Sequence, residues 1–108
     1  MSERIGHFEQ LLLLALLRLG DESYGVPIRG EIERRTNRVV SPGAIYTALD
    51  RLERRGLVRS RLGDPTPQRG GKRKRHYRLT AKGRAAVREA QAALTQMAHG
   101  LEPKLGTT

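Results

Sequence analysis

The stretch SPGAIYTALDRLERRGLV, residues 41–58, carries the clearest structural signals of this chain. Ser41 is a favourable helix N-cap, and Pro42 stands at the first helical position, where the N–H that proline lacks would have no helical partner. Gly56 marks the end of the helix. The apolar residues that recur at helical spacing between these ends are Ile45, Ala48, Leu49 and Leu52. The stretch therefore predicts a helix with one face in a core and the other face exposed.

The exposed face of this helix is suited to a DNA groove. Its first turns offer Gly43, Ala44 and short hydroxyl side chains, so the helix stays narrow enough for its side chains to reach base edges. The free N–H groups beside Ser41 also suit a phosphate. We expect the DNA-contacting residues of the helix to be Ser41, Gly43, Ala44, Tyr46, Thr47, Asp50 and Arg51. The alternative is an ordinary surface helix with a good N-cap.

A basic hairpin is predicted directly after the helix. Residues 57–62 and 72–79 are predicted strands, and the Gly- and Pro-rich residues 63–71 between them predict a loop. Between Arg51 and Arg78 there are eleven Lys and Arg residues against two acidic ones, so nine of the ten net positive charges lie here. Such a patch of one sign beside a recognition helix favours a polyanionic partner, with nucleic acid first.

The hairpin, or wing, carries donors for several phosphates. We expect the wing residues on the DNA backbone to be Arg69, Lys72, Arg73, Lys74 and Arg75. A solvated basic loop or a disordered basic arm is the alternative. Apolar residues return on both sides of the loop, and this pattern favours an ordered hairpin.

The helices predicted at the two ends of the chain carry more apolar area than a small winged domain covers. Residues 5–19 are apolar around most of the helix circumference, and Gly20 suits the left-handed position that ends the helix. In residues 80–101, capped by Thr80, apolar residues repeat at steps of three and four. We expect a homodimer whose interface includes Ile5, Phe8, Leu12, Val87, Ala90, Leu94, Met97 and Leu101. The alternative is that the last helix packs back on the first helix of its own chain.

The elements together predict a fold class. An amphipathic helix begins after Ser23, and residues 39–40 are a short β-like pair. The resulting order predicts a mainly α fold, a winged helix-turn-helix with an N-terminal helix and a C-terminal dimerisation helix. The expected organisation is a DNA-binding domain over residues 1–79, the dimerisation helix over 80–101 and a disordered tail over 102–108.

Composition and motifs argue against several other classes. The chain has no cysteine, which rules out disulfides and thiolate metal sites and favours a cytoplasmic location. The longest apolar run, residues 11–17, is far shorter than the roughly 20 residues that cross a bilayer, and we expect no targeting segment and no membrane partner. His7, His76 and His99 have no second ligand at metal spacing. Without a catalytic triad, paired carboxylates or a phosphate-binding loop motif, we expect no enzyme and no cofactor.

Two stretches carry a resemblance to a known family. They are GAIYTALDRLERRGLV, residues 43–58, and GGKRKRHYRLTAKG, residues 70–83, preceded by Tyr24-Gly25 at the start of a helix. The first contains Gly-x-x-Tyr-x-x-Leu-x-x-Leu-Glu, and the second is a Gly-Gly and basic wing that closes on Tyr-x-Leu-Thr. Over residues 8–98 the chain resembles the PadR family of bacterial transcriptional regulators.

The resemblance implies a dimeric repressor that binds inverted repeats in double-stranded DNA. It implies that the wing contacts the DNA backbone and that the first and last helices form the dimer interface. The residues that it implies on the DNA side of the recognition helix are Ser41, Gly43, Tyr46, Thr47 and Arg51. Family members release DNA when they bind phenolic or drug-like compounds. The multidrug-binding branch relies on a tryptophan in the last helix, which this chain lacks.

We therefore predict a sequence-specific DNA-binding transcriptional regulator, a homodimeric repressor of an inverted-repeat operator with a small-molecule effector of unknown identity. Two alternatives stay open: a sequence-neutral winged helix that binds DNA or RNA through charge, and a protein-interaction module that docks an acidic partner. A specific regulator would hold its site against random duplex by roughly 10³-fold or more, whereas a charge-only binder would not.

Overall fold

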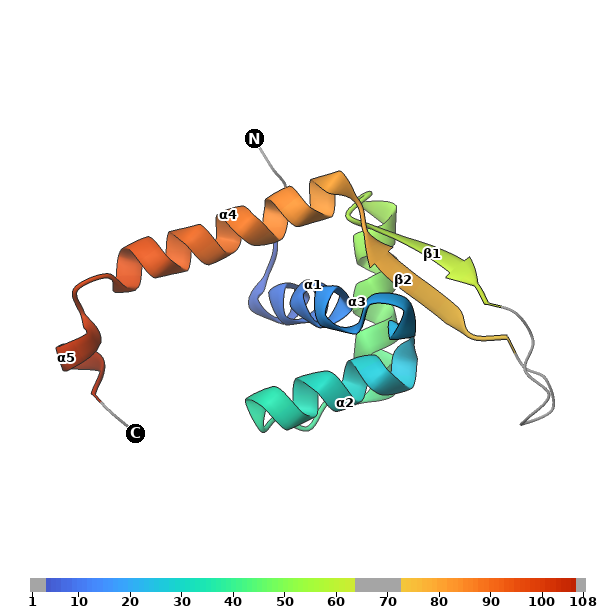
Figure 1. Ribbon diagram of the computed structural model, residues 1–108, viewed down its shortest axis with the longest axis horizontal. Coiled ribbons are helices and arrows are strands. Elements are labelled where there is room, and N and C mark those ends of the chain that lie inside the picture. Colours follow the sequence, from blue (N-terminus) through green and yellow to red (C-terminus); the bar gives the residue numbers. More distant parts are fainter. Residues whose placement is uncertain (1–3, 64–72, 107–108) are drawn as a thin grey trace.

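The computed structural model describes residues 4–63 and 73–106 of the chain. It confirms a mainly helical fold with a small antiparallel sheet, in the predicted order of a winged helix-turn-helix (Figure 1). The elements in chain order are α1 His7–Leu19, the 3-10 helix η1 Gly20–Glu22, α2 Gly25–Thr36, α3 Pro42–Arg54, β1 Val58–Leu62, β2 Arg75–Leu79, α4 Ala81–Ala98 and α5 Glu102–Leu105.

Three of the predicted helix boundaries are confirmed, whereas the last helix ends at Ala98 and not at Leu101. The Ser41 hydroxyl accepts a hydrogen bond from the backbone N–H three residues on, at 3.1 Å, and Pro42 is the first residue of α3. The Thr80 hydroxyl accepts from the Gly83 N–H at 3.0 Å at the start of α4. Gly20, which closes α1, has a φ of +56°, in the left-handed region that glycine adopts without steric cost. These local signals fixed the element boundaries to within a few residues.

Two segments differ from expectation. Residues 39–40 do not form a strand, because the Val40 N–H donates to the Glu33 carboxylate at 2.8 Å instead of pairing with another strand. The segment after α4, expected to be a disordered tail, contains the short helix α5. Gly100 separates the two helices with a φ of +82°.

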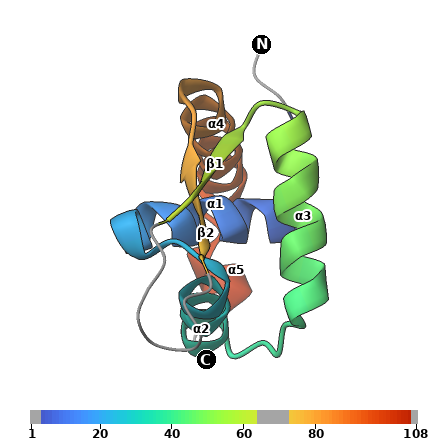
Figure 2. The same ribbon diagram turned by 90° about the vertical axis from the view of Figure 1, so that its right-hand side faces the viewer.

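α1 lies at the centre of the core. Its two apolar faces are covered by α2 on one side and α4 on the other, while α3 stands across its end (Figures 1 and 2). Each fully buried leucine contributes roughly 1.5–3 kcal/mol by leaving water, so this aliphatic packing is the main stabilising term. The core residues are Leu12, Leu13, Ala15, Leu16, Ile28, Ile32, Val40, Ile45, Ala48, Leu49, Leu52, Leu57, Val58, Tyr77, Ala86 and Val87.

The two strands pair in a fixed register and are held to the start of α2. Arg59 lies opposite Arg78 and Ser60 opposite Tyr77. Ser23, which is fully buried, accepts a hydrogen bond from the Tyr77 N–H at 2.9 Å through its carbonyl and donates its hydroxyl to the Tyr77 carbonyl. This double link attaches β2 to the junction between η1 and α2.

The first turn of α4 approaches the backbone of Leu57 very closely. The Leu57 carbonyl accepts from the Thr80 N–H at 3.0 Å, and the Thr80 hydroxyl donates to the Gly56 carbonyl at 2.7 Å. A Cβ added to Gly83 would lie 2.1 Å from the Leu57 oxygen. Only glycine therefore allows α4 to leave the sheet at this angle.

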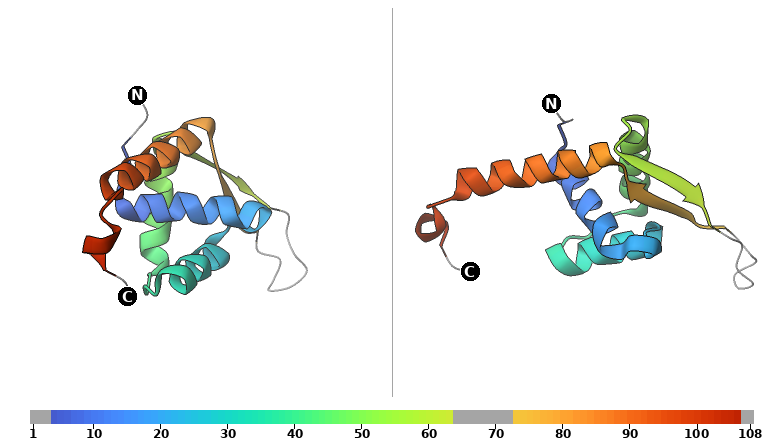
Figure 3. Two further views of the ribbon diagram at one scale, coloured as in Figure 1. Left: turned by 60° about the vertical axis from the view of Figure 1, so that its left-hand side comes forward. Right: turned by 45° about the horizontal axis from the view of Figure 1, so that its top comes forward.

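The distal half of α4 projects away from the rest of the domain (Figure 3). Near the middle of α4, the Gln91 side chain accepts a hydrogen bond from the side-chain amide of Gln10 in α1 at 3.1 Å. Further along α4, Leu94 and Met97 are 56% and 77% exposed.

No helix in the described part of the chain is both long enough and apolar enough to span a membrane.

We expect Gly83→Ala to lower the free energy of unfolding by about 1–3 kcal/mol, because its methyl group would overlap the Leu57 backbone oxygen, which accepts a hydrogen bond from the Thr80 N–H. Chemical denaturation monitored by circular dichroism measures this. Gly30→Ala is the matched control, since a Cβ there meets nothing within 4 Å. It should be neutral or stabilise by up to about 1 kcal/mol. Equal effects of the two substitutions would contradict the close approach.

Candidate DNA-binding surface

The two faces of α3 are those that the sequence predicted. Its apolar residues are buried, and the residues of its N-terminal turn are exposed, among them Gly43 and Ala44. Thr47 and Arg51 are exposed one and two turns further along the same side. The helix thus presents a narrow N-terminal half beside polar side chains, the shape needed to enter a major groove.

Tyr46 lies between the two helices of the helix-turn-helix. A Cβ added to Gly25, the first residue of α2, would be 1.9 Å from the Tyr46 hydroxyl oxygen. The ring therefore rests on bare backbone at the start of α2, and 48% of the residue remains exposed. Tyr46 was expected to contact bases. The structure places its hydroxyl against the first residue of α2, a contact between α2 and α3 that the sequence did not predict.

The charges on α3 differ in how strongly the protein holds them. Asp50 forms an exposed ion pair with Arg54, worth only about 0.3–0.5 kcal/mol, which a DNA phosphate can readily displace. Arg55 turns inward instead, and its guanidinium reaches the Glu9 carboxylate at 3.3 Å and the Arg4 carbonyl. Arg51 forms no ion pair within the described residues, so its charge is available to a ligand.

The turn between α2 and α3 is fixed by Glu33. Its carboxylate accepts from the Val40 N–H at 2.8 Å and from the Arg29 guanidinium at 3.2 Å. The backbone hydrogen bond from Val40 and the nearby Arg29 lower the pKa of Glu33. Sequence reasoning missed this residue because a Glu among helix-surface charges gives no sign of a contact seven residues away.

Three of the five predicted wing residues lie in the described part of the chain, and Arg69 and Lys72 lie outside it. Arg73 is exposed. Lys74 is half-buried: its ammonium lies 4.4 Å from the centre of the Tyr24 ring and donates to the Tyr24 hydroxyl at 3.3 Å. Lys74 therefore attaches the wing to the start of α2, a contact worth about 0.5–1 kcal/mol at such a site.

The wing is also joined directly to α3. The Arg75 guanidinium donates to the Ser60 hydroxyl at 3.0 Å, and that hydroxyl donates to the Glu53 carboxylate at 2.7 Å. Glu53 also accepts the Ser60 N–H at 3.1 Å. Burial raises the pKa of the neighbouring Tyr77. The chain of contacts holds β1, β2 and α3 in one fixed geometry, so the helix and the wing meet a partner as one surface.

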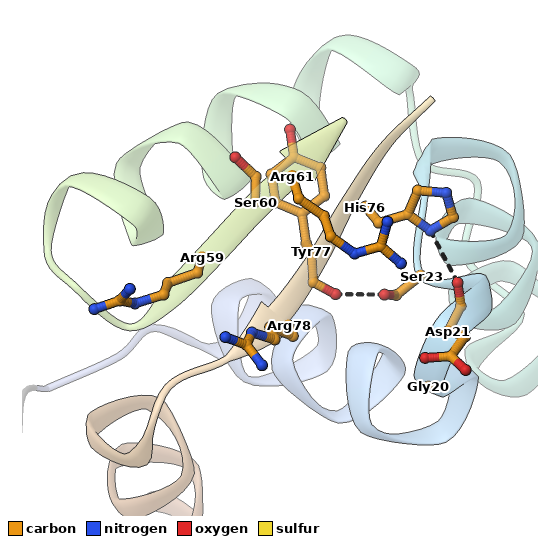
Figure 4. Close-up of a pocket in the computed structure, with 9 residues that line it drawn as sticks. All are labelled: Gly20, Asp21, Ser23, Arg59, Ser60, Arg61, His76, Tyr77 and Arg78. Atoms are coloured by element: carbon orange, nitrogen blue, oxygen red, sulfur yellow. Dashed lines mark hydrogen bonds between the residues drawn. The ribbon is translucent and has the colours of Figure 1, made fainter. Parts of the chain in front are cut away.

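The strand residues Arg59, Arg61 and Arg78 belong to the predicted basic patch but were not among the residues predicted to contact DNA, and they lie on the outer face of the sheet. They lie beside a recess of about 420 Å³ (Figure 4). Strand alternation, which places every second residue on the same face, was the available signal. The residues that line the recess are Gly20, Asp21, Ser23, Arg59, Ser60, Arg61, His76, Tyr77 and Arg78.

The residues predicted for a dimer interface divide into three groups. Leu12 and Val87 are core residues of the single chain, because α1 and the first half of α4 pack on each other, and so they have almost no surface left for a partner. The half-buried residues are Ile5, Phe8 and Ala90. The exposed residues are Leu94, Met97 and Leu101.

Comparison with known proteins gives the family. The model of the transcriptional regulator PadR-like family matches residues 13–89, which include α2, α3, the sheet and the first half of α4. The chain belongs to the PadR-like family of transcriptional regulators. The resemblance stated from the recognition helix and wing motifs is confirmed.

Related proteins agree with this assignment. The chain is 40% identical over 80 residues to transcriptional regulator Rv3488 of Mycobacterium tuberculosis, which covers 72% of this chain and 68% of the relative. A PadR family transcription regulator from Clostridium difficile R20291 is 25% identical, with a TM-score of 0.76 over 94% of this chain and all of the other. F93 from STIV, a winged-helix DNA-binding protein, shares the fold at 20% identity, with a TM-score of 0.69 over 91% of this chain and 98% of the other.

The PadR-like chain is therefore a DNA-binding transcriptional regulator with a winged-helix fold, and its family is one of regulators and not of enzymes. Among the described residues, no group of three or more His, Asp or Glu side chains is placed to hold a metal ion. Among the described residues, α3 and the wing expose Arg51 and Arg73.

We expect Gly25→Ala to weaken binding to a specific DNA site by about tenfold, since a lost or displaced groove contact costs about 1–3 kcal/mol. The added methyl would push away the Tyr46 hydroxyl, the mobile end of a side chain, so the free energy of unfolding should change by less than about 1 kcal/mol. Fluorescence anisotropy with labelled duplex measures the binding. Gly30→Ala in the same helix should bind as the unmodified protein does, and unchanged affinity in Gly25→Ala would show that the Tyr46 position does not matter.

Proposed function

We propose that this PadR-like regulator is a cytoplasmic homodimeric repressor that binds an inverted-repeat operator. The observation that carries the proposal is the fixed unit of α3 and wing, joined through Glu53, Ser60 and Arg75. Two surfaces held in one geometry place base-reading and phosphate-binding groups at a set distance, as recognition of a defined sequence requires. A binder that used charge alone would not need this geometry.

Within this surface we divide the predicted residues by function. Thr47 and Arg51 are assigned to the bases, because both are exposed on the groove-facing side of α3. Ser41, with the first N–H groups of the helix, is assigned to a phosphate. Arg73 and its neighbours in the wing are assigned to the backbone of the same half-site.

The dimer is proposed from the distal half of α4. Leu94 and Met97 place apolar surface on a helix that extends beyond its own domain, and Leu101 adds to it in the segment between α4 and α5. A second copy related by a two-fold axis would cover this surface and would place two α3 helices toward one face of the duplex. That arrangement gives the inverted repeat its physical basis.

Release by a small-molecule effector depends on the same dimer. An apolar hollow between α1 and α2, lined in part by Leu11, Leu14 and Ile32, has a volume of about 190 Å³. Pockets for drug-sized ligands span roughly 300–1,000 Å³. We therefore propose that a second copy completes any effector pocket of this protein.

The first experiment is selection from a random duplex library at near-physiological salt. We expect the unmodified protein to enrich an inverted repeat. Thr47→Ala should enrich a different sequence. Lys72→Ala/Arg73→Ala should enrich the same sequence but bind all duplexes more weakly. Arg84→Ala/Arg88→Ala on α4 removes the same charge from exposed positions and serves as the control. Retained duplex without a shared motif would favour the charge-only binder, and no retention would favour an acidic protein partner.

Met97→Asp is expected to raise the dimer dissociation constant at least tenfold, because it buries a charge in an apolar interface. Sedimentation velocity over a concentration series measures this. Val26→Asp is a matched control, since Val26 is 75% exposed and Met97 is 77% exposed. A dimer unaffected by Met97→Asp would move the interface away from α4.

A further inference from the structure

The outer face of the sheet carries a cluster of positive groups away from α3. Ser60 on β1 and Tyr77 on β2 point toward α3, so the residues that flank each of them along its strand point to the opposite side of the sheet (Figure 4). Arg59 and Arg61 come from β1, and Arg78 comes from β2. We call these three residues the outer arginine cluster.

The cluster is not neutralised by the described part of the chain. None of its three guanidinium groups forms an ion pair or hydrogen bond there, and Asp21 supplies the single carboxylate that lines the recess. Arg59 and Arg78 lie directly opposite each other across the strands. Like charges in that position destabilise a sheet unless an anion lies between or beside them.

The recess beside the cluster has a fixed wall. His76 donates through Nδ1 to the Asp21 carbonyl at 2.9 Å, and its ring lies 5.1 Å from that of Tyr24. Buried Ser23 holds the adjacent strand at the base. At about 420 Å³ the recess has room for a compact polar ligand. Shape and charge therefore coincide at one place.

We propose that the outer arginine cluster binds a phosphate group at a site separate from α3. Arginine presents a planar fork of donors that matches the oxygens of a phosphate, and Arg61 and Arg78 approach the recess from two strands. The phosphate belongs either to a small phosphorylated molecule or to the DNA backbone beyond the operator half-site. Only the second source rests on the proposed function.

Inorganic pyrophosphate is the probe for the first source. It is titrated into the DNA-free protein at constant ionic strength and followed by ¹⁵N NMR, including the arginine side-chain signals. We expect saturable shifts at the cluster, with affinity about tenfold weaker in Arg61→Gln and in Arg78→Gln. Asp21→Asn should strengthen binding, because it removes the one opposing carboxylate. Arg84→Gln on the exposed face of α4 is the control and should change nothing.

Duplex length tests the second source. Anisotropy compares the selected operator with and without added flanking base pairs, using unmodified protein and Arg61→Gln/Arg78→Gln, with circular dichroism to confirm folding. If the flanking base pairs raise the affinity several-fold for the unmodified protein but not for Arg61→Gln/Arg78→Gln, the phosphate belongs to DNA. Pyrophosphate shifts that depend on the cluster support the small-molecule source even if no operator is enriched. Shifts equal in Arg84→Gln and Arg61→Gln, together with no flank effect, overturn the proposal.

Discussion

The backbone of Leu57 is the point where α3, the sheet and α4 are joined. Its N–H donates to the Leu52 carbonyl at 2.9 Å at the end of α3, and its own carbonyl accepts the Thr80 N–H before α4. The missing side chain of Gly83 lets the first turn of α4 lie against that carbonyl. Because Leu57 is fully buried, these backbone groups need partners inside the protein, and the partners available fix the angle between the three elements.

From this junction the geometry extends to both proposed contact surfaces. On one side, Glu53 and Ser60 hold the wing to α3, and Lys74 holds it to Tyr24 at the start of α2. On the other side, the direction of α4 determines how far its exposed apolar half lies from α3. Operator half-site spacing would therefore follow from the same backbone contacts that stabilise the core.

The excess positive charge has more than one use in this chain. Arg55 forms an ion pair with Glu9, and Arg75 donates a hydrogen bond to Ser60 within the wing. Both guanidinium groups therefore already have partners inside the protein. Arg51 and Arg73 are exposed on the side of α3 and the wing, while Arg61 lies on the outer face of the sheet. A net charge counted along the sequence therefore overstates what any one face offers to DNA.

The main helices, the two wing strands and their order could be predicted from the chain alone, because caps such as Ser41 and Thr80, the Gly20 end and apolar spacing act over a few residues. The short helix α5 and the course of residues 39–40 could not. The sequence also identified the buried and exposed faces of α3, and the motifs identified the family. Only the tertiary structure placed Leu12 in the core of one chain, set Tyr46 against Gly25 and separated the outer arginine cluster from the wing contacts. Those outcomes depend on contacts between residues far apart in the chain, and no local period encodes which helix will cover which face.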